Sequence, residues 1–257
     1  MPDDATRDPE PVTEPVTEPV IEPIACATCA VRHRSLCAAL TSAEIAGLNR
    51  ISQRRRFGAG EIVALEGDDA FAHGNVVSGV AKLVRGLEDG REQIVGLLFP
   101  SDFMGRPLAP GTGTPHTIQA ATVVEMCVFP RRPFDALIAE HPSLERKLLE
   151  RTLGELDAAR DWMLLLGRKT AAERVATFLH TIARRSREVG CKPAEGVDIG
   201  FDIPLTRQDM ADFIGLTIET VSRQMTKLRK EGVIVLEGNR RIARVDMTRL
   251  AARAALR

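Results

Sequence analysis

Residues 206–228 read TRQDMADFIGLTIETVSRQMTKL, and this stretch predicts a helix-turn-helix. Thr206 can cap a first helix through Asp209, which stands at its third helical position. Gly215 permits the sharp turn that follows, and Thr217 can cap a second helix. Apolar side chains at helical spacing are expected to pack the two helices together. They are Met210, Phe213, Ile214, Val221, Met225 and Leu228.

The opposite face of the second helix is expected to read bases in the major groove of DNA. Arg223 can donate two hydrogen bonds to guanine and Glu219 can accept one from cytosine, each worth about 1–3 kcal/mol of discrimination. Ile218 and Ser222 suit a thymine methyl group and an adenine edge. Phosphate contacts, which carry no sequence information, are expected from Thr217, Lys227, Arg229 and Lys230. The alternative is a solvated helix on which Glu219 and Arg223 form an i,i+4 charge pair.

The residues around this motif support a nucleic-acid-binding module. Two short strand runs, 233–236 and 242–245, with a turn at Gly238-Asn239, predict a wing. The chain as a whole is neutral, with 35 basic and 35 acidic residues. From Pro204 to the end, however, eleven basic residues face six acidic ones. This local excess of positive charge suits a polyanionic partner.

A long helix is predicted upstream, over 141–169, and a second one over 171–187. Two rows at heptad spacing on the long helix carry no charge. They are Leu149, Leu156 and Met163, and Thr152, Ala159 and Leu166. A narrow uncharged stripe is typical of a coiled-coil seam between two subunits. The alternative is an ordinary helix of the core.

Residues 57–140 are predicted to form an antiparallel roll or barrel of about eight strands. Eleven of the twenty glycines lie within 57–113, between short apolar runs at 61–65, 76–78, 81–84 and 93–99. Asp89-Gly90 is a strong hairpin signal. One further strand is expected over 117–129. The predicted fold class is therefore α+β: a β-roll, a long dimerisation helix and a C-terminal winged helix-turn-helix.

The N-terminal region differs in composition. Residues 10–23 read EPVTEPVTEPVIEP, and the first 24 residues carry seven acidic residues and one basic residue. This predicts a disordered tail. A short helix capped by Thr41 and Glu44 is expected over 41–52, before the basic run Arg54-Arg55-Arg56. No apolar run approaches the roughly 20 residues of a membrane helix, and no secretory signal is seen, so a cytoplasmic location is expected.

Five cysteines in such a chain favour metal or redox chemistry over structural disulfides. Cys26, Cys29 and Cys37 have the spacing C-x2-C-x7-C, which can wrap three thiolates around one soft metal centre. His33 would complete a local Cys3His zinc site. An iron-sulfur cluster needs about four thiolates, so its fourth ligand would come from elsewhere. Taken alone, Cys127 is equally typical of a buried apolar residue, and Cys191 is interpreted as a spare thiol.

The order of these parts, from Cys26 to Arg244, resembles the Crp/Fnr superfamily of bacterial transcription regulators, whose roll is the cyclic-nucleotide-binding kind. Residues 215–223, GLTIETVSR, resemble the recognition motif of its oxygen-sensing Fnr branch and are closest to the FnrL group. The resemblance implies that Glu219, Ser222 and Arg223 read TTGAT-type half-sites of a palindromic operator. It also implies a homodimer that contacts RNA polymerase and responds to dioxygen.

The same resemblance implies a ligand set for one 4Fe-4S cluster per subunit. In that branch the fourth thiolate comes from the last strand of the roll, a position that Cys127 matches. The implied ligands are Cys26, Cys29, Cys37 and Cys127. The structural zinc site formed by Cys26, Cys29, His33 and Cys37 stays open as the alternative, in a DNA-binding regulator with an unknown signal.

Two departures from related patterns carry further expectations. A cyclic-nucleotide-binding roll carries a Gly-Glu pair and then an Arg-Ser or Arg-Thr that holds the phosphate. Here Phe103-Met104-Gly105 is followed by Arg106-Pro107, and no arginine stands beside Thr117. No cyclic nucleotide is therefore expected to bind. Ala159 stands where the enterobacterial pattern has a seam aspartate whose repulsion separates cluster-free subunits, so the cluster-free protein is expected to stay dimeric. The sequence has no phosphate-binding glycine loop, no defensible Ser/His/Asp set and no tyrosine, so an enzyme is not expected.

The expected organisation has five parts. They are the tail at 1–24, the cysteine loop and short helix at 25–56, the sensory roll at 57–140, the dimerisation helix at 141–169 and the winged helix-turn-helix at 170–257.

Overall fold

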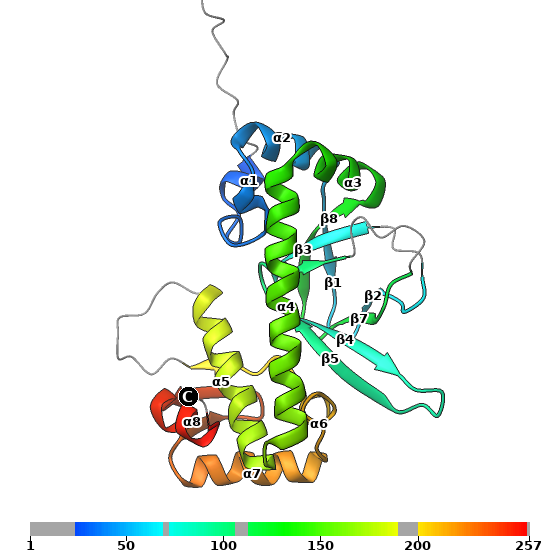
Figure 1. Ribbon diagram of the computed structural model, residues 1–257. Helices are drawn as coiled ribbons and strands as arrows, with labels where there is room; N and C mark the ends of the chain where they lie inside the picture. Colours follow the sequence, from blue (N-terminus) through cyan, green and yellow to red (C-terminus); the bar gives the residue numbers. More distant parts are fainter. Residues whose placement is uncertain (1–23, 69–71, 106–112, 190–199, 256–257) are drawn as a thin grey trace, which may run out of the picture.

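The computed structural model describes residues 24–68, 72–105, 113–189 and 200–255. The expectations for the tail, Arg106, Cys191 and most of the loop at 190–200 lie outside these residues. One long helix, α4 (Pro142–Arg168), organises the molecule. The N-terminal helices lie at one end of it, the β-roll lies along its side and the C-terminal helices lie at the other end (Figure 1).

The N-terminal part is small and helical. Its elements are α1 (Ile24–Ala27), the 3-10 turn η1 (Leu36–Ala39) and α2 (Ser42–Ile51). The predicted cap of α2 is confirmed, because the Glu44 side chain accepts a hydrogen bond from the Thr41 backbone N–H at 2.6 Å. Leu36 and Ile45 pack into a core shared with Phe129 and Phe134, so this part is attached to the end of the roll.

The roll consists of two four-stranded sheets, with strand orders β1-β8-β3-β6 and β2-β7-β4-β5. The strands are β1 (Gln53–Phe57), β2 (Ile62–Ala64), β3 (Ala72–Ser78), β4 (Ala81–Gly86), β5 (Glu92–Leu98), β6 (Phe103–Met104), β7 (Thr117–Ala120) and β8 (Val124–Pro130). Val76, Ala81, Val124 and Met126 are fully buried between the sheets. The antiparallel eight-stranded prediction is therefore confirmed for the described residues.

The single strand expected over 117–129 is wrong, because β7 and β8 lie in different sheets. The chain crosses between them at residues 121–123, where the Val80 carbonyl accepts hydrogen bonds from Ala121 N and Thr122 N at 2.9 and 3.2 Å. Gly79, at φ +79°, lies so close to the Val123 carbonyl that a side chain there would clash. The crossing therefore depends on a neighbouring turn about 40 residues away.

Two elements near the cysteines were among those not predicted. The basic run at Arg54–Arg56, to which no element was assigned, forms strand β1 with its side chains largely exposed. Helix α3 (Arg131–Glu140) follows β8 and buries Phe134 and Ile138. Both elements pack around the cysteine-bearing region, so missing them left the surroundings of that site undefined.

The C-terminal part contains the predicted helix-turn-helix. Its elements are α5 (Ala171–Val189), β9 (Phe201–Asp202), α6 (Arg207–Ile214), α7 (Ile218–Lys230), β10 (Ile234–Glu237), β11 (Arg241–Val245) and α8 (Met247–Arg253). The wing is confirmed as the β10–β11 hairpin, and β9 adds a third strand to it. Gly215 turns the chain between α6 and α7 at φ +64°. The six apolar positions expected between these helices are all buried.

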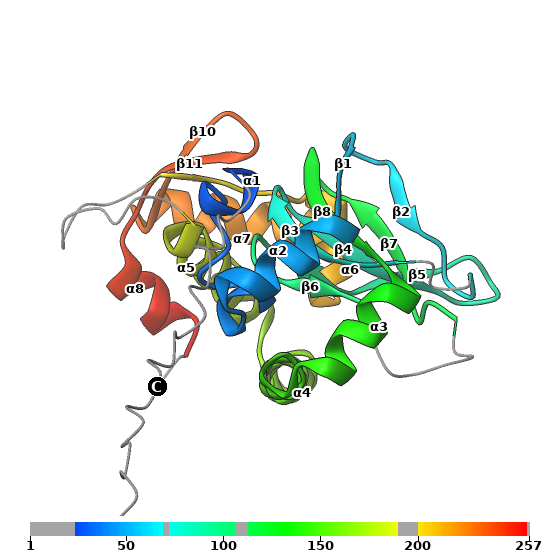
Figure 2. The same cartoon turned by 90° about the horizontal axis from the view of Figure 1, so that it is seen from above.

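Seen down its axis, α4 has the roll and the C-terminal part on one side, and its opposite side is uncovered (Figure 2). Its middle exposes leucine and methionine side chains, while Leu144 and Leu165 near its ends are buried. Within the described ranges, no helix combines the length and apolar character that crossing a membrane requires.

Candidate DNA-reading surface and cysteine site

Helix α7 presents the predicted base-reading side chains to solvent. Thr217 caps the helix by accepting a hydrogen bond from the Thr220 backbone N–H at 3.3 Å. Val221, Met225 and Leu228 pack inward, and the 3.6-residue period therefore turns the other face outward. Ile218, Glu219, Ser222 and Arg223 are all exposed on that face.

The charges on this face are available for a partner. The hydrogen bonds of Glu219 to its own backbone N–H and to the Thr217 hydroxyl lower the pKa of its carboxyl group, so it is an ionised acceptor. Arg223 Nη2 lies 3.5 Å from the Thr220 hydroxyl oxygen. Within the described part of the chain, no ion pair joins Glu219 to Arg223. The alternative of a self-neutralising charge pair is therefore not formed.

The predicted phosphate contacts are grouped at the C-terminal half of α7. Lys227, Arg229 and Lys230 are exposed there. Lys227 and Lys230 also line a shallow surface hollow together with Ser222, Arg223 and Thr226. Thr217 differs from them, because its hydroxyl already serves as the helix cap and lies 3.1 Å from the Thr220 hydroxyl.

Arg174 on α5 links the end of α4 to the turn of the helix-turn-helix. Its guanidinium donates hydrogen bonds to two carbonyls at the C-terminal end of α4, those of Leu166 at 2.6 Å and Lys169 at 3.0 Å. It also donates to the carbonyls of Ile214 at 3.1 Å and Gly215 at 3.2 Å. The turn before the reading helix is thereby tied to the long helix. Local sequence patterns gave no signal for this contact.

The roll also contacts the helix-turn-helix directly, through the β4–β5 hairpin. Lys82 Nζ lies 2.5 Å from Asp209 Oδ1, and the Gln93 amide donates a hydrogen bond to the Asp212 carbonyl. On another side of α6, the rings of Trp162 and Phe213 stack with centroids 4.2 Å apart. Helix α6 is therefore held by both the roll and α4.

The seam predicted on α4 is largely exposed, and it is wider than expected. Met163 is 73% exposed, and Leu149 and Leu156 are also open to solvent. Thr152 and Ala159 are exposed, while Leu166 is half-buried. Leu153 and Leu164, which the heptad rows left out, add further exposed apolar surface. The alternative of an ordinary core helix does not describe the middle of α4.

The four cysteines assigned as cluster ligands lie in one region, where the loop at 26–37 meets strand β8. Cys26, Cys37 and Cys127 all pack against the core shared by the loop, β8 and α3. Burial raises the pKa of the Cys37 thiol to about 11, with further contributions from Cys127, Cys26 and Cys29. Burial likewise raises the pKa of Cys127, although Ser52 and Arg54 oppose the shift.

The thiols share a region but do not yet share a metal-binding geometry. Among the residues that the structure describes, no three His, Cys, Asp or Glu side chains are placed to hold one metal ion. None of these four cysteines forms a disulfide in the described structure, and each is half-buried. His33 is exposed and is not one of the groups that shift the pKa of Cys37 or Cys127.

Polar side chains that sequence reasoning missed surround the thiols. The Cys26 thiol donates to Asn49 Oδ1 at 3.4 Å, and Arg54 Nη2 donates to Cys29 Sγ at 3.6 Å. The Asn75 amide, 2% exposed, donates to Cys37 Sγ at 3.9 Å. Its Oδ1 is buried and has no hydrogen-bond partner in the described structure. These residues come from segments that only tertiary packing brings together.

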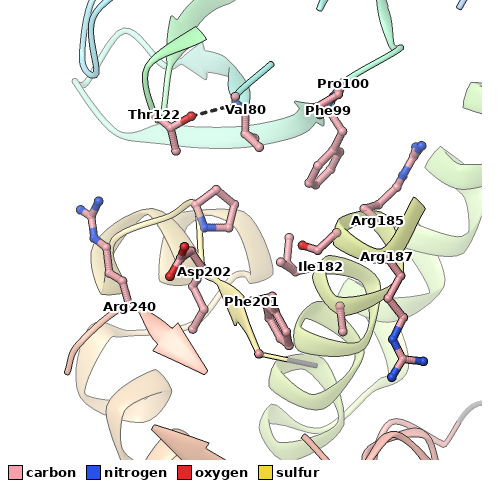
Figure 3. Close-up of a pocket in the computed structure, with 16 residues that line it drawn as sticks. Val80, Phe99, Pro100, Thr122, Ile182, Arg185, Arg187, Phe201, Asp202 and Arg240 are labelled. Carbon is pink, nitrogen blue, oxygen red and sulfur yellow. Dashed lines mark hydrogen bonds between the residues drawn. The ribbon is translucent and has the colours of Figure 1, made fainter. Parts of the chain in front are cut away.

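A pocket of about 570 Å³ lies between the roll and the C-terminal part (Figure 3). Its floor is apolar and includes Phe99, Ile182 and Phe201. The guanidinium groups of the lining arginines lie at its edge in this view and do not converge on the floor. The pocket thus offers apolar surface but no grouped charges for a small anion.

A second pocket, of about 520 Å³, lies inside the roll beside α4. Its lining is mainly apolar and also includes Arg55, Asp68, His116 and Glu155. The absence of cyclic nucleotide binding stays a prediction, since Arg106, on which part of that argument rests, lies outside the described residues.

Comparison with known proteins gives two domain matches. A Crp-like helix-turn-helix domain model matches residues 173–253, and a cyclic nucleotide-binding domain model matches residues 54–141. Together they cover the roll and the C-terminal part.

Whole-chain relatives agree with these matches. The chain is 47% identical to the transcriptional activator protein FnrL of Cereibacter sphaeroides, over 89% of this chain and 91% of the relative. It is also 47% identical to a probable transcriptional activator of Rhizobium leguminosarum, over 88% and 92% of the two chains. The solved structure of FixK2 from Bradyrhizobium japonicum superposes with a TM-score of 0.69 and 33% identity, covering 79% of this chain and 96% of that one.

Proposed function

Since this chain belongs to the Crp/Fnr family of DNA-binding transcription regulators and is not an enzyme, we propose that it controls anaerobic gene expression in response to oxygen. The observation that carries this proposal is that Cys26, Cys29 and Cys37 lie in the same region as Cys127, in a protein with an exposed reading helix. Because its target is chromosomal DNA, the regulator acts in the cytoplasm.

The donor set fits a 4Fe-4S cluster. Four thiols from two segments match the number of thiolates that such a cluster requires. The buried Asn75 amide beside them, with an unpaired oxygen, is the kind of polar group that surrounds a metal centre. When bound, the cluster supplies an oxygen-labile link between the loop at 26–37 and β8. Cluster formation would require the thiols to close together and lose their protons.

The loop is positioned to transmit this link to α4. Leu36, from the loop, packs with Phe129 of β8 and with Leu144 at the start of α4. Any free energy that the cluster adds to this arrangement favours the DNA-competent dimer and is lost when the cluster is destroyed. The protein would therefore bind DNA when oxygen is absent.

DNA recognition follows from the exposed faces of α4 and α7. Two copies would pair through the seam at Leu149, Thr152, Leu156, Ala159, Met163 and Leu166. A two-fold dimer reads a palindrome with half-sites about one helical turn apart. Glu219, Ser222, Arg223 and Ile218 would read each TTGAT-type half-site, while Lys227, Arg229, Lys230 and the Thr217 helix start contact phosphates. RNA polymerase would then contact the DNA-bound dimer.

The zinc alternative has less support. It replaces Cys127 by His33, yet it is Cys127 that contributes to the pKa shift of Cys37, and His33 is exposed. A structural zinc site would also leave the regulator without a signal.

The test is metal analysis and a visible spectrum of protein purified without oxygen, repeated after air is admitted. We expect about four irons and four sulfides per chain and a colour that bleaches in air. Cys127→Ala should abolish iron and sulfide uptake, whereas Cys191→Ala, the matched control, should leave it unchanged. A colourless protein that holds one zinc and loses it in His33→Ala would contradict the proposal.

A further inference from the structure

At the cysteine site, paired residues on three adjacent strands of the roll place their side chains in one row. In the antiparallel register, Cys127 on β8 lies opposite Arg54 on β1 and opposite Asn75 on β3. Directly paired residues of an antiparallel sheet place their side chains on the same face. A guanidinium and an amide therefore flank the Cys127 thiol, one from each neighbouring strand.

The guanidinium of Arg54 reaches from this row to the cysteine loop. Its Nη1 lies 3.3 Å from Glu125 Oε1 on β8, which holds the side chain in place. Its Nη2 donates a hydrogen bond to Cys29 Sγ at 3.6 Å. The ion pair thus orients a positively charged donor toward one sulfur of the loop.

The amide of Asn75 makes the equivalent contact on the other side. It donates to Cys37 Sγ at 3.9 Å, and its side chain is almost completely buried. A buried polar atom without a partner costs free energy, and the Asn75 Oδ1 is such an atom among the described residues. Packing alone gives no reason for an amide at this position, whereas a donor to sulfur does.

We propose that Arg54 and Asn75 are positioning residues of the cysteine site, which donate N–H···S hydrogen bonds to Cys29 and Cys37 on either side of Cys127 and thereby set the oxygen tolerance of the sensor. This inference rests on the proposed iron-sulfur function and deepens it. Two residues that are not cluster ligands would then control how readily oxygen destroys the cluster.

The direction of the effect follows from charge. Hydrogen bonds to the sulfurs stabilise negative charge, so they favour the reduced state of an iron-sulfur centre and raise its reduction potential. Removing either donor should lower the potential and make the centre easier to oxidise. It also frees one side of the loop from the sheet, which adds to the loss.

The experiment compares Arg54→Met, Asn75→Val and wild-type protein, all loaded with iron and sulfide without oxygen. Arg56→Met is the matched control, because Arg56 lies two residues along the same strand and, in the described structure, donates to no cysteine sulfur. The readouts are the reduction potential, and the lifetime of the visible absorbance after mixing with air-saturated buffer.

We expect lifetimes about tenfold shorter in Arg54→Met and Asn75→Val, the scale typical of residues that support metal ligands. Their potentials should be lowered, and the control should match the wild type. Arg54→Lys, which keeps a charged donor, should recover part of the lifetime. Loosening of the loop alone would expose the centre to water, which stabilises the more negative reduced state and therefore would not lower the potential.

Two results would overturn the proposal in distinguishable ways. If the wild type takes up iron and sulfide and both variants match it in lifetime and potential, the donor role is wrong. If the wild type takes up neither, the proposed oxygen-sensing function fails, and this inference fails with it. Arg54 is on the surface, so its variant answers the question even if Asn75→Val does not fold.

Discussion

Arg223 and Lys227 lie about one turn apart on α7, but we expect them to contribute differently to DNA binding. Arg223→Ala should cost about 1–3 kcal/mol at a TTGAT-type palindrome and relax base preference, because it removes the two donors proposed to contact a base. Lys227→Ala should weaken specific and unrelated duplexes alike and reduce the salt slope by about one, because the contact proposed for Lys227 is with phosphate. Fluorescence anisotropy across a salt series measures both. Equal weakening on both duplexes by Arg223→Ala would rule out base reading.

His73 is expected to make stability depend on pH. Its fully buried ring packs against the rings of Phe103 and Phe134, and its Nε2 is 3.4 Å from Asp135 Oδ1. Burial lowers the pKa of His73, although Asp135 opposes this and Arg131 adds to it. The fold therefore favours the neutral ring.

The contribution of His73 is present above the unfolded-state pKa of about 6.5 and is lost as pH falls toward the lowered folded value. We expect the free energy of unfolding to decrease between neutral pH and mildly acidic pH, by at most about 1.4 kcal/mol per pH unit for this one group. His73→Phe should flatten the profile in urea titrations. His180, whose pKa burial also lowers, adds to the slope in the same direction. An unchanged slope in His73→Phe would contradict the assignment.

At the scale of elements, the uncovered side of α4 is expected to be the subunit interface. Met163→Glu would place two like charges opposite each other across a two-fold seam. We expect the dimer dissociation constant to rise about tenfold or more, equivalent to about 1.4 kcal/mol. Ala158→Glu, at an exposed position of the same helix outside the seam, is the matched control and should leave it unchanged. Sedimentation velocity distinguishes these outcomes, and equal effects of the two variants would argue against this seam.

Arg174 is expected to couple α4 to the helix-turn-helix. Arg174→Met leaves the carbonyls of Leu166, Ile214 and Gly215 without this donor, at a cost of about 1–3 kcal/mol. Calorimetry should show a lower melting temperature for the variant. Arg174→Lys should restore only part of the loss, because an ammonium group lacks the planar fork of donors. Full restoration by lysine would show that charge alone matters.

At the scale of the whole molecule, the cluster-free protein is expected to stay dimeric. Ala159 places no charge in the seam, and it is exposed on α4. Control by oxygen would then work through reorientation of the C-terminal part, which the roll already contacts at Lys82–Asp209. Size-exclusion chromatography of the cluster-free protein at micromolar concentration tests this. A clean monomer would contradict it, and Ala159→Asp should produce that monomer.

The parts that the sequence determined by itself are those in which cause and effect lie within a few residues. The caps at Thr206 and Thr217, the left-handed turn at Gly215 and the inward face of α7 depend on hydrogen bonds and periodicity inside 23 residues, and all are confirmed. The wing and the hairpin around Asp89-Gly90 were predicted for the same reason. The cysteine loop was recognisable from its own spacing.

Only the tertiary structure decided what depends on contacts between distant segments. The break between strands at 121–123 requires hydrogen bonds to Val80. The hydrogen bonds of Arg174 require both the end of α4 and the turn at Gly215. The side-by-side placement of Arg54, Cys127 and Asn75 requires the register of three strands. A strand pattern reports which faces are buried but not which strand lies alongside, because hydrogen-bonded pairing is set by the whole sheet. The sequence therefore indicated the reading helix and the thiols, and the fold decided which side chains surround them.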